Sequence, residues 1–204
     1  MRYVIWLINV RFKVTRYFDY IYNKAVFFVN KINAPVNNIN GRVFVKNKGL
    51  ISIGNNFKAN SGKNKNPIGG DGLLRFIVDE DGELEIGDNV GISNSTFFCC
   101  ERISIDDYVY IGGGCRLWDT NFHSLDPYER LHNGDKKVNT APIKIKKYVF
   151  IGGGSIILKG VTIGEYSVIG AGSVVVKSVP DREIWGGNPA RFIRKIEIKE
   201  RQPD

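Results

Sequence analysis

The stretch "IKKYVFIGGGSIILKGVTIGEYSVIGAGSVVVKSV", residues 145–179, decides the fold of this 204-residue chain. Its aliphatic residues recur every six positions without a slip, at Ile145, Ile151, Ile157, Ile163, Ile169 and Val175. Four residues after each stands a small or β-branched residue: Val149, Ser155, Val161, Ser167, Ser173 and Val179. A period of six fits neither an isolated helix nor a hairpin array. It predicts short strands and turns that stack as a coil, with the aliphatic side chains inside.

The same period continues toward the N-terminus, less evenly. One register holds Ile86, Ile92 and Phe98, and a second, offset by one residue, holds Ile105, Ile111 and Leu117. The segment "ISIGNNF" at 51–57 has the pattern of a further unit. An ordinary β-sandwich would instead show strands about 8–12 residues apart with alternating polarity. We therefore predict an all-β solenoid over residues 41–184, whose coils are hydrogen-bonded to one another.

The repeat is interrupted at "RLWDTNFHSLDPYER", residues 116–130, and resumes near residue 144. The segment 118–144 must therefore leave the coil, and it holds both histidines of the chain, His123 and His132. Loops on rigid scaffolds often carry function, and histidine is the natural general base near neutral pH. We expect His123 to be that base, with Asp119 or Asp126 holding its second ring nitrogen.

Positive charge is confined to the first quarter of the chain. The net charge is +8, and residues 1–48 alone, in which Asp19 is the one acid, account for it. The neutral remainder argues against a nucleic-acid-binding scaffold. Three cysteines, two of them adjacent, make no disulfide framework and favour a reducing, cytoplasmic setting. No apolar run approaches the roughly 20 residues of a membrane-spanning helix.

Residues 1–33 have the pattern of an amphipathic helix, within an N-terminal segment 1–40. Its apolar residues are Tyr3, Leu7, Val10, Val14, Tyr17, Ile21, Ala25, Phe28 and Ile32, at steps of three and four. Two interpretations stay open. The basic, aromatic helix could lie on an anionic membrane surface at the cytoplasmic face. Alternatively, its apolar stripe could pack on the coil or on a sister subunit.

Over about residues 50–196 the sequence resembles the hexapeptide-repeat acyltransferase family, most closely its sugar O-acetyltransferases. The resemblance implies a left-handed parallel β-helix, acetyl-CoA as co-substrate, a homotrimer and no metal. The handedness comes from the resemblance alone, because general crossover rules favour the right hand. The segment "DTNFHSLD" is similar to the catalytic segment of that family, whose histidine is the general base, and this implies the same role for His123.

The resemblance also implies positions for the two substrates. Similarity to "IGGG", "GAGSVVVKSVP" and "GGNPARFIRKI", the last within a C-terminal tail 185–204, places the coenzyme at Gly153, Ala171, Val176, Lys177, Arg191 and Arg194. Small residues let a ligand approach the backbone, and basic residues pair with phosphate. Trp185 could stack on the adenine or cap the coil. For the acceptor, the resemblance implies Asn60, and Asp81 aligns loosely with an acidic acceptor-binding position. From their places in the coil and the loop we also expect Asn94, Asn121 and Arg130, with a buried asparagine ladder as the alternative for Asn94; for Cys100, a core role is favoured.

We therefore expect an acetyl-CoA-dependent O-acetyltransferase that acts on a sugar, as a lipid-linked precursor of a surface polysaccharide. N-acetylation of an amino sugar is an alternative on the same scaffold. A zinc hydratase built on such a coil would need three histidine ligands, and the chain has two. A purely structural solenoid would need neither the histidine-bearing excursion nor "GNPA" with its arginines.

Overall fold

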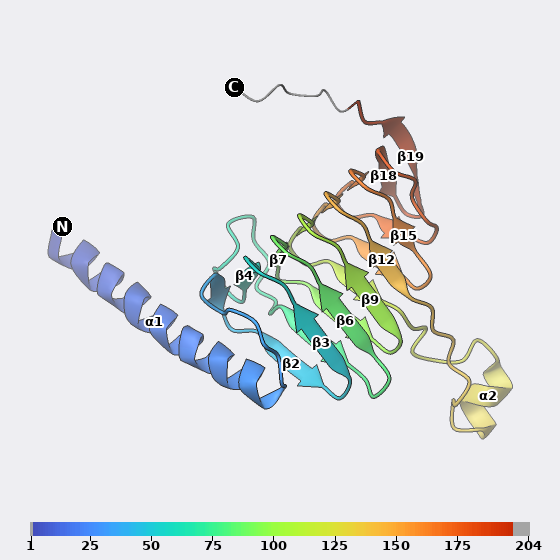
Figure 1. Ribbon diagram of the computed structural model, residues 1–204, viewed down its shortest axis with the longest axis horizontal. Helices are drawn as coiled ribbons and strands as arrows, with labels where there is room; N and C mark the ends of the chain where they lie inside the picture. Colours follow the sequence, from blue (N-terminus) through green and yellow to red (C-terminus); the bar gives the residue numbers. More distant parts are fainter. Residues whose placement is uncertain (1, 198–204) are drawn as a thin grey trace.

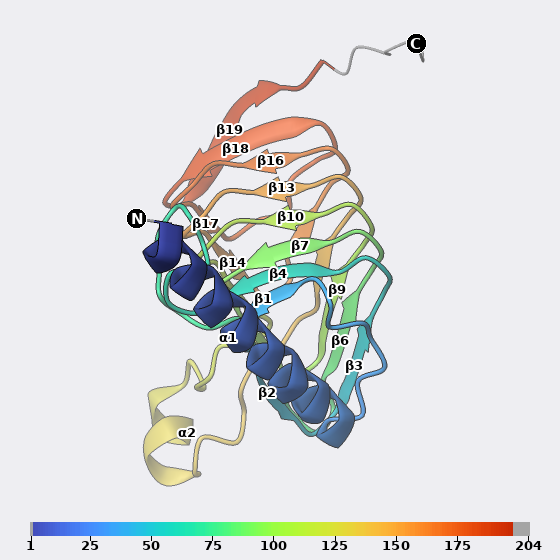
Figure 2. The ribbon, with the colours of Figure 1, turned by 90° about the vertical axis from the view of Figure 1, so that its left-hand side faces the viewer.

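A triangular coil of three parallel sheets forms the body of the protein (Figures 1 and 2). The computed structural model describes residues 2–197, with side chains from residue 13 onward. Sheet 1 contains β1 (Ile39–Gly41), β4 (Lys58–Ser61), β7 (Gly91–Ser93), β10 (Tyr110–Ile111), β13 (Phe150–Ile151), β16 (Val168–Ile169), β18 (Glu183–Gly187) and β19 (Ala190–Lys195).

Sheets 2 and 3 complete each coil. Sheet 2 contains β2 (Phe44–Asn47), β5 (Arg75–Val78), β8 (Thr96–Cys99), β11 (Arg116–Trp118), β14 (Ile156–Leu158) and β17 (Val174–Val175). Sheet 3 contains β3 (Leu50–Ile53), β6 (Glu83–Ile86), β9 (Arg102–Ile105), β12 (Ile143–Ile145) and β15 (Thr162–Ile163). Each strand pairs with its equivalent in the next coil, so the predicted left-handed parallel β-helix is confirmed.

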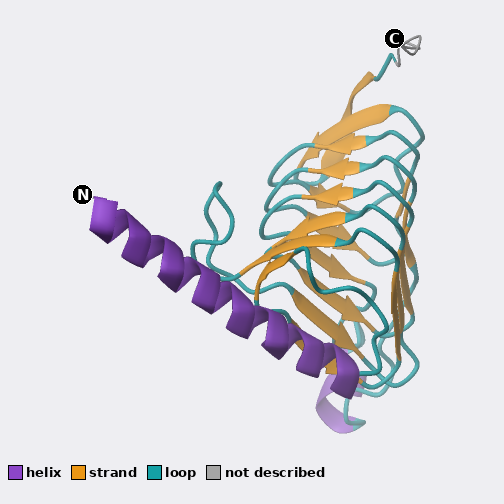
Figure 3. Cartoon of the chain, turned by 60° about the vertical axis from the view of Figure 1, so that its left-hand side comes forward, coloured by secondary structure: helices purple, strands orange, loops and turns teal. Residues whose placement is uncertain are grey.

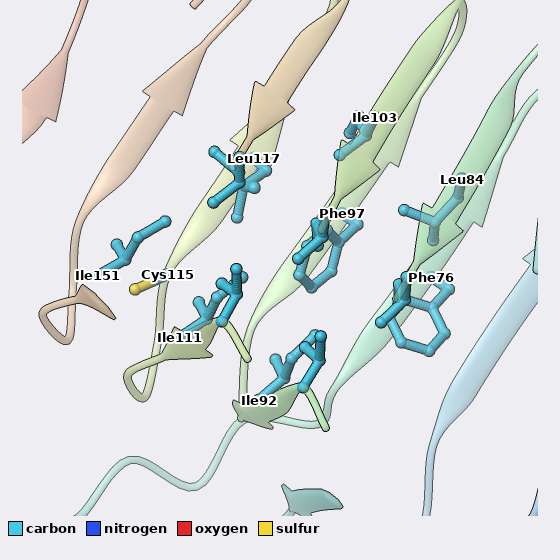
Figure 4. Close-up of a cluster of buried hydrophobic side chains, with 14 of the residues drawn as sticks. Phe76, Leu84, Ile92, Phe97, Ile103, Ile111, Cys115, Leu117 and Ile151 are labelled. Atoms are coloured by element: carbon cyan, nitrogen blue, oxygen red, sulfur yellow. The ribbon is translucent and has the colours of Figure 1, made fainter. Parts of the chain in front are cut away.

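The core consists of rows of inward-pointing side chains stacked from coil to coil. Phe76, Phe97 and Leu117 are in register on sheet 2 and fully buried, as Figure 4 shows. The rings of Phe76 and Phe97 lie 5.5 Å apart. The predicted series from Ile145 to Val175 is likewise fully buried. The six-residue period thus marks one inward residue on each face of the triangle.

The corner between sheets 3 and 1 repeatedly holds a left-handed residue that is not glycine. These residues, with φ between 55° and 61°, are Asn56, Asn89, Tyr108, Tyr148, Tyr166 and Arg182. The tyrosine rings stack along the coil axis, with centroids 5.1 and 4.7 Å apart. Ring stacking stabilises a backbone conformation that tyrosine otherwise adopts at a cost.

Helix α1 (Arg2–Val29) covers the first coil with the face that the sequence pattern did not select. Asn23 donates to the Gly41 carbonyl and accepts from the Val43 amide, at 2.8 and 3.0 Å. Phe27 is buried beside it. The predicted apolar stripe points outward instead: Tyr17 is 62% and Phe28 85% exposed. Packing of this stripe on the coil of its own chain is therefore wrong; Ile32, beyond the helix, is its one buried member among the described side chains.

Two segments leave the coil, and a hairpin formed by β18 and β19 covers its last turn. Residues 62–74 form an excursion between β4 and β5, and residues 119–142, which include α2 (Pro127–His132), form another between β11 and β12. Figure 1 shows α1 and α2 on opposite sides of the coil. The region predicted as a tail begins as an antiparallel hairpin, β18 with β19, which extends sheet 1. Figure 3 shows it at the end of the coil away from α1.

Candidate active site

The excursion that follows β11 presents His123 to solvent. Its side chain is 73% exposed, and Nδ1 lies 2.5 Å from Oδ2 of Asp135. The other oxygen of Asp135 accepts the Ser124 amide at 2.6 Å. One carboxylate therefore fixes both the ring and the backbone beside it. This arrangement holds the imidazole at one orientation without burying it.

The charge state of Asp135 decides which nitrogen of His123 is free. The Ser124 amide, followed by the His123 ring, lowers the pKa of Asp135 below its usual range. At neutral pH the carboxylate is ionised and can only accept hydrogen bonds, so Nδ1 must carry the hydrogen. The lone pair of the neutral ring then lies on Nε2, which has no protein partner among the described residues. This is the tautomer that a general base needs.

Asp119 and Asp126, the two expected partners of His123, have other roles. Asp119 is fully buried and accepts the amides of Cys100 and Glu101, both at 2.8 Å. Burial raises its pKa, against the effect of these hydrogen bonds. Asp126 caps the N-terminus of α2. The expectation was wrong because the chain folds back after α2 and brings Asp135 to the ring, which spacing along the sequence does not reveal.

The remainder of the excursion braces this pair. Arg130 donates to the Ser124 carbonyl at 2.6 Å, so it supports the segment that carries His123. Glu129 is buried and accepts from Lys137 at 2.7 Å. His132 packs its ring against Tyr128 in α2, with centroids 4.8 Å apart. The base of the excursion is closed by the pairing of Thr120 with Thr140.

An apolar row runs from the excursion along the outer face of sheet 2. Phe122 packs on Phe98 and Trp118, with ring centroids 4.8 and 5.5 Å apart. Trp118 is in register with Leu158 on the next coil. Val176, 42% exposed, follows β17 on the coil beyond. The apolar row thus runs from the residue next to His123 toward the coils that carry the predicted coenzyme positions Val176 and Lys177.

The other predicted coenzyme positions fall at two places. Gly153 and Ala171 stack with Gly113 at the corner between sheets 1 and 2, where the Gly172 amide donates to the Gly153 carbonyl at 2.9 Å. A Cβ on Gly152 would lie 2.5 Å from the Ala171 nitrogen, so the coils approach closely there. Arg191 and Arg194 are on β19, with exposed side chains. Trp185 is in register with Ile169 at the end of the coil.

The structure separates the predicted acceptor residues. Asn60 lies on sheet 1 in a cavity of about 530 Å³, with Ser93, Tyr110 and Lys58. Asn94 is buried instead, and its amide donates to the Gly70 carbonyl, which ties down the 62–74 excursion. Asp81 and Cys100 line the same surface pocket. Partial burial raises the pKa of the Cys100 thiol. Asn121 donates its backbone amide to Asn139 at the loop base.

No cluster of three or more metal-binding side chains occurs within residues 2–197. The residues around His123 supply one imidazole and one carboxylate, and that carboxylate is engaged by the ring and by an amide. Such a donor set does not make the three-ligand site of a catalytic zinc. An exposed imidazole that is paired with a carboxylate can take up and release a proton near neutral pH.

Comparisons with known proteins find similarity to hexapeptide-repeat transferases. Residues 142–177 match the bacterial transferase hexapeptide repeat (six repeats). A hexapeptide-repeat acetyltransferase, VCA0836 of Vibrio cholerae, solved with acetyl coenzyme A, is 37% identical with a TM-score of 0.52, over 56% of this chain and 61% of that one. A maltose O-acetyltransferase of Clostridium difficile is also 37% identical, with a TM-score of 0.51, over 56% and 60%.

A third solved protein represents acylation of nitrogen. A variant of AntD, an N-acyltransferase of Bacillus cereus solved with dTDP and coenzyme A, is 28% identical with a TM-score of 0.58, over 78% of this chain and 80% of that one. The chain spans between 48% and 62% of the length of the first curated relatives that it matches. By its repeat and its coil, the chain is similar to the hexapeptide-repeat acyltransferases.

Proposed function

We propose that this protein is an acetyl-CoA-dependent O-acetyltransferase that acts on a sugar hydroxyl, in the biosynthesis of a surface polysaccharide. The observation that carries the proposal is the His123–Asp135 pair. It is an exposed imidazole whose tautomer is set by an ionised carboxylate, at the one place where the solenoid is interrupted by a helix-bearing excursion. Two similar proteins support this choice of donor and acceptor. The Vibrio cholerae protein was solved with acetyl coenzyme A, and the Clostridium difficile protein is described as a maltose O-acetyltransferase.

The reaction is a direct acyl transfer. Nε2 of His123 removes the proton of the acceptor hydroxyl as its oxygen attacks the thioester carbonyl carbon. The tetrahedral intermediate collapses, the carbon–sulfur bond breaks, and the ester forms. The imidazolium returns its proton to the leaving thiolate, so free coenzyme A departs as a thiol. Asp135 stabilises the imidazolium that exists between the two proton transfers.

The donor would lie along the outer face of sheet 2. The apolar row from Phe122 to Val176 suits the pantetheine arm, because it presents no charge beside His123. Lys177 directly follows Val176 and is exposed, and the arginines of β19 are exposed at the end of the coil. Basic side chains at that end would pair with the phosphates of the coenzyme. Gly153 and Ala171 would offer backbone groups from the neighbouring corner.

The acceptor would occupy the cavity that Asn60 lines. The Asn60 side chain accepts a hydrogen bond from the Asn40 amide at 3.3 Å and donates one to the Ser93 hydroxyl at 3.2 Å. The ring of Tyr110 lies over Gly91, where any Cβ would meet it at 2.8 Å. Amides, a hydroxyl and an aromatic ring match the hydroxyls and the apolar faces of a sugar. Because this cavity and His123 lie on different faces of the coil, we also propose a homotrimer.

A second candidate is N-acylation of an amino sugar at the cytoplasmic face. It is favoured by AntD, whose structure with dTDP covers more of this chain than the two other likenesses do. An amine acceptor must also lose a proton, so His123 would serve either reaction. The two differ only in the acceptor atom.

The test compares His123→Ala with the matched variant His132→Ala, which removes the other imidazole of the same excursion. We expect release of coenzyme A to fall by about 10²- to 10⁴-fold in the first variant and to stay near wild type in the second. Sugar hydroxyl acceptors and their amino-sugar analogues, assayed side by side, distinguish O- from N-transfer. If the activity of His123→Ala stays within tenfold of wild type, His123 is not the general base.

A further inference from the structure

Helix α1 turns its apolar side away from the protein. We define the outer face of α1 as Val14, Tyr17, Phe18, Ile21, Tyr22, Phe28 and Val29, which are between 38% and 85% exposed. At 100° per residue these positions fall on one continuous arc. Charged side chains are absent from this arc over residues 13–29. A monomeric protein rarely exposes so large a continuous apolar surface.

The opposite side of the helix binds the coil, through the polar residues Asp19 and Asn23 and through the buried ring of Phe27. Asp19 is buried and pairs with Arg42 and Lys65, at 2.8 and 3.4 Å. Asn23 holds the first coil by its two backbone hydrogen bonds. Four hydrogen bonds and ion pairs thus fix which face points outward. The exposure of the apolar arc is therefore a consequence of specific contacts.

The charges beside the outer face identify its partner. Lys13 and Lys24 flank the arc and are exposed, with Lys24 over the Tyr20 ring. The one acid of the first 48 residues, Asp19, is already neutralised by two cations. If a second copy of the chain docked through the same face, the lysines beside the two helices would repel one another. An anionic phospholipid surface offers both an apolar interior and negative headgroups.

We propose that the outer face of α1 docks the protein on an anionic membrane. The helix lies in the interface, because no described helix is long and apolar enough to cross a bilayer. Tyr17, Phe18 and Tyr22 enter the headgroup region, while Lys13 and Lys24 contact the phosphates. The coil stays in water beneath the helix, so its sheets are left free for the substrates.

Vesicle flotation of the full chain tests this proposal without any assay of acetyl transfer. We expect the protein to float with vesicles of phosphatidylcholine and phosphatidylglycerol at least about tenfold more than with phosphatidylcholine alone, and salt at about 0.5 M to reduce binding. The double variant Phe18→Ser/Ile21→Ser should lose about tenfold in binding. The matched control Leu50→Ser/Ile68→Ser removes two more exposed apolar side chains elsewhere and should bind as wild type.

Three results would overturn the proposal. They are an equal affinity for neutral vesicles, unchanged binding by Phe18→Ser/Ile21→Ser, and absence of binding by the folded wild type. Light scattering of the same variants identifies the competing partner. If Phe18→Ser/Ile21→Ser dissociates the oligomer and the wild type does not float, a second copy covers this face. Circular dichroism verifies that each variant is folded, which its surface positions favour.

Discussion

Asp135 is the residue that contacts the His123 ring, although twelve positions separate them. The sequence alone singled out His123 as the expected base, but it did not identify the partner of its ring. A break in a strict repeat indicates an excursion, and histidine is the natural base within it. Which acid meets the ring depends on the turn after α2, where Asp135 adopts φ 56°. Neither Asp119 nor Asp126 could be set aside without knowing the hydrogen bonds that each already makes.

At the residue scale we first predict that Asp135→Asn lowers kcat by about 10²- to 10⁴-fold with little change in KM. The asparagine amide can no longer fix the hydrogen on Nδ1, and it cannot stabilise the imidazolium. Steady-state kinetics with saturating acetyl-CoA measure both constants. Asp126→Asn is the matched control, because Asp126 acts on α2 rather than on the ring. An equal loss in both variants would mean that Asp135 acts only by holding the excursion together.

A second prediction concerns acid pH. Because the folded-state pKa of Asp135 is lowered, the stabilisation from this carboxylate is complete above its unfolded pKa of about 3.9 and is lost as pH falls through the folded value. We therefore expect the amide resonance of Ser124 to move only below about pH 4, together with the Asp135 carboxyl carbon. Nuclear magnetic resonance titration follows both. A carboxyl carbon that titrates above pH 4 would contradict the assigned direction.

At the scale of elements, the close approach of neighbouring coils determines which residues can occupy the corners between the sheets. A Cβ on Gly152 would lie 2.5 Å from a backbone nitrogen, although its φ is ordinary. Gly172 has the opposite constraint: φ is 71°, and nothing lies within 4 Å of an added Cβ. We predict that Gly172→Ala lowers the free energy of unfolding by about 1–2 kcal/mol and that Gly152→Ala lowers it more. Chemical denaturation measures both, and the reverse order would refute the packing argument.

The base of the excursion yields a further prediction. Asp119, itself buried, accepts two partly buried amides of the preceding coil, so Asp119→Ala leaves both donors without this partner. We expect a loss of about 1–3 kcal/mol in the free energy of unfolding, because an unsatisfied donor costs about 1–3 kcal/mol when fully buried and less when water can reach it. Asp119→Asn keeps one acceptor oxygen and should lose less. Equal losses in the two variants would show that the negative charge, rather than the hydrogen bonds, is what matters there.

Period six was enough to predict the sheets, because it records one inward residue on each face of the coil. The helix shows the limit of such patterns. An apolar stripe predicts that a face will be covered, yet it does not identify the partner. In α1 the polar side binds the coil through Asp19 and Asn23, which residue hydrophobicity alone would have placed in solvent. The 62–74 excursion carries no periodic signal, and Asn94, an expected acceptor contact with a buried asparagine as the alternative, is buried beneath it.

At the scale of the whole molecule, the predicted base and the predicted acceptor cavity are on different faces. His123 follows β11 and lies at the corner between sheets 2 and 3, whereas Asn60 lies on the outer face of sheet 1. A rigid coil cannot bring these faces together, since its rows are fully packed. If both residues serve one reaction, they must come from two chains. Rotational symmetry would then repeat the same composite site at every interface.

Mixing two inactive variants tests this composite site. His123→Ala and Asn60→Ala should each lose most activity alone, but co-expressed in equal amounts they should recover about a quarter of the wild-type rate. In a trimer with sites between neighbours, a site is intact when one chain keeps His123 and the next keeps Asn60, and each has an even chance. Native mass spectrometry verifies that mixed trimers form. If they form without recovering activity, His123 and Asn60 do not combine across an interface, and the acceptor site lies beside His123 on sheets 2 and 3 without Asn60.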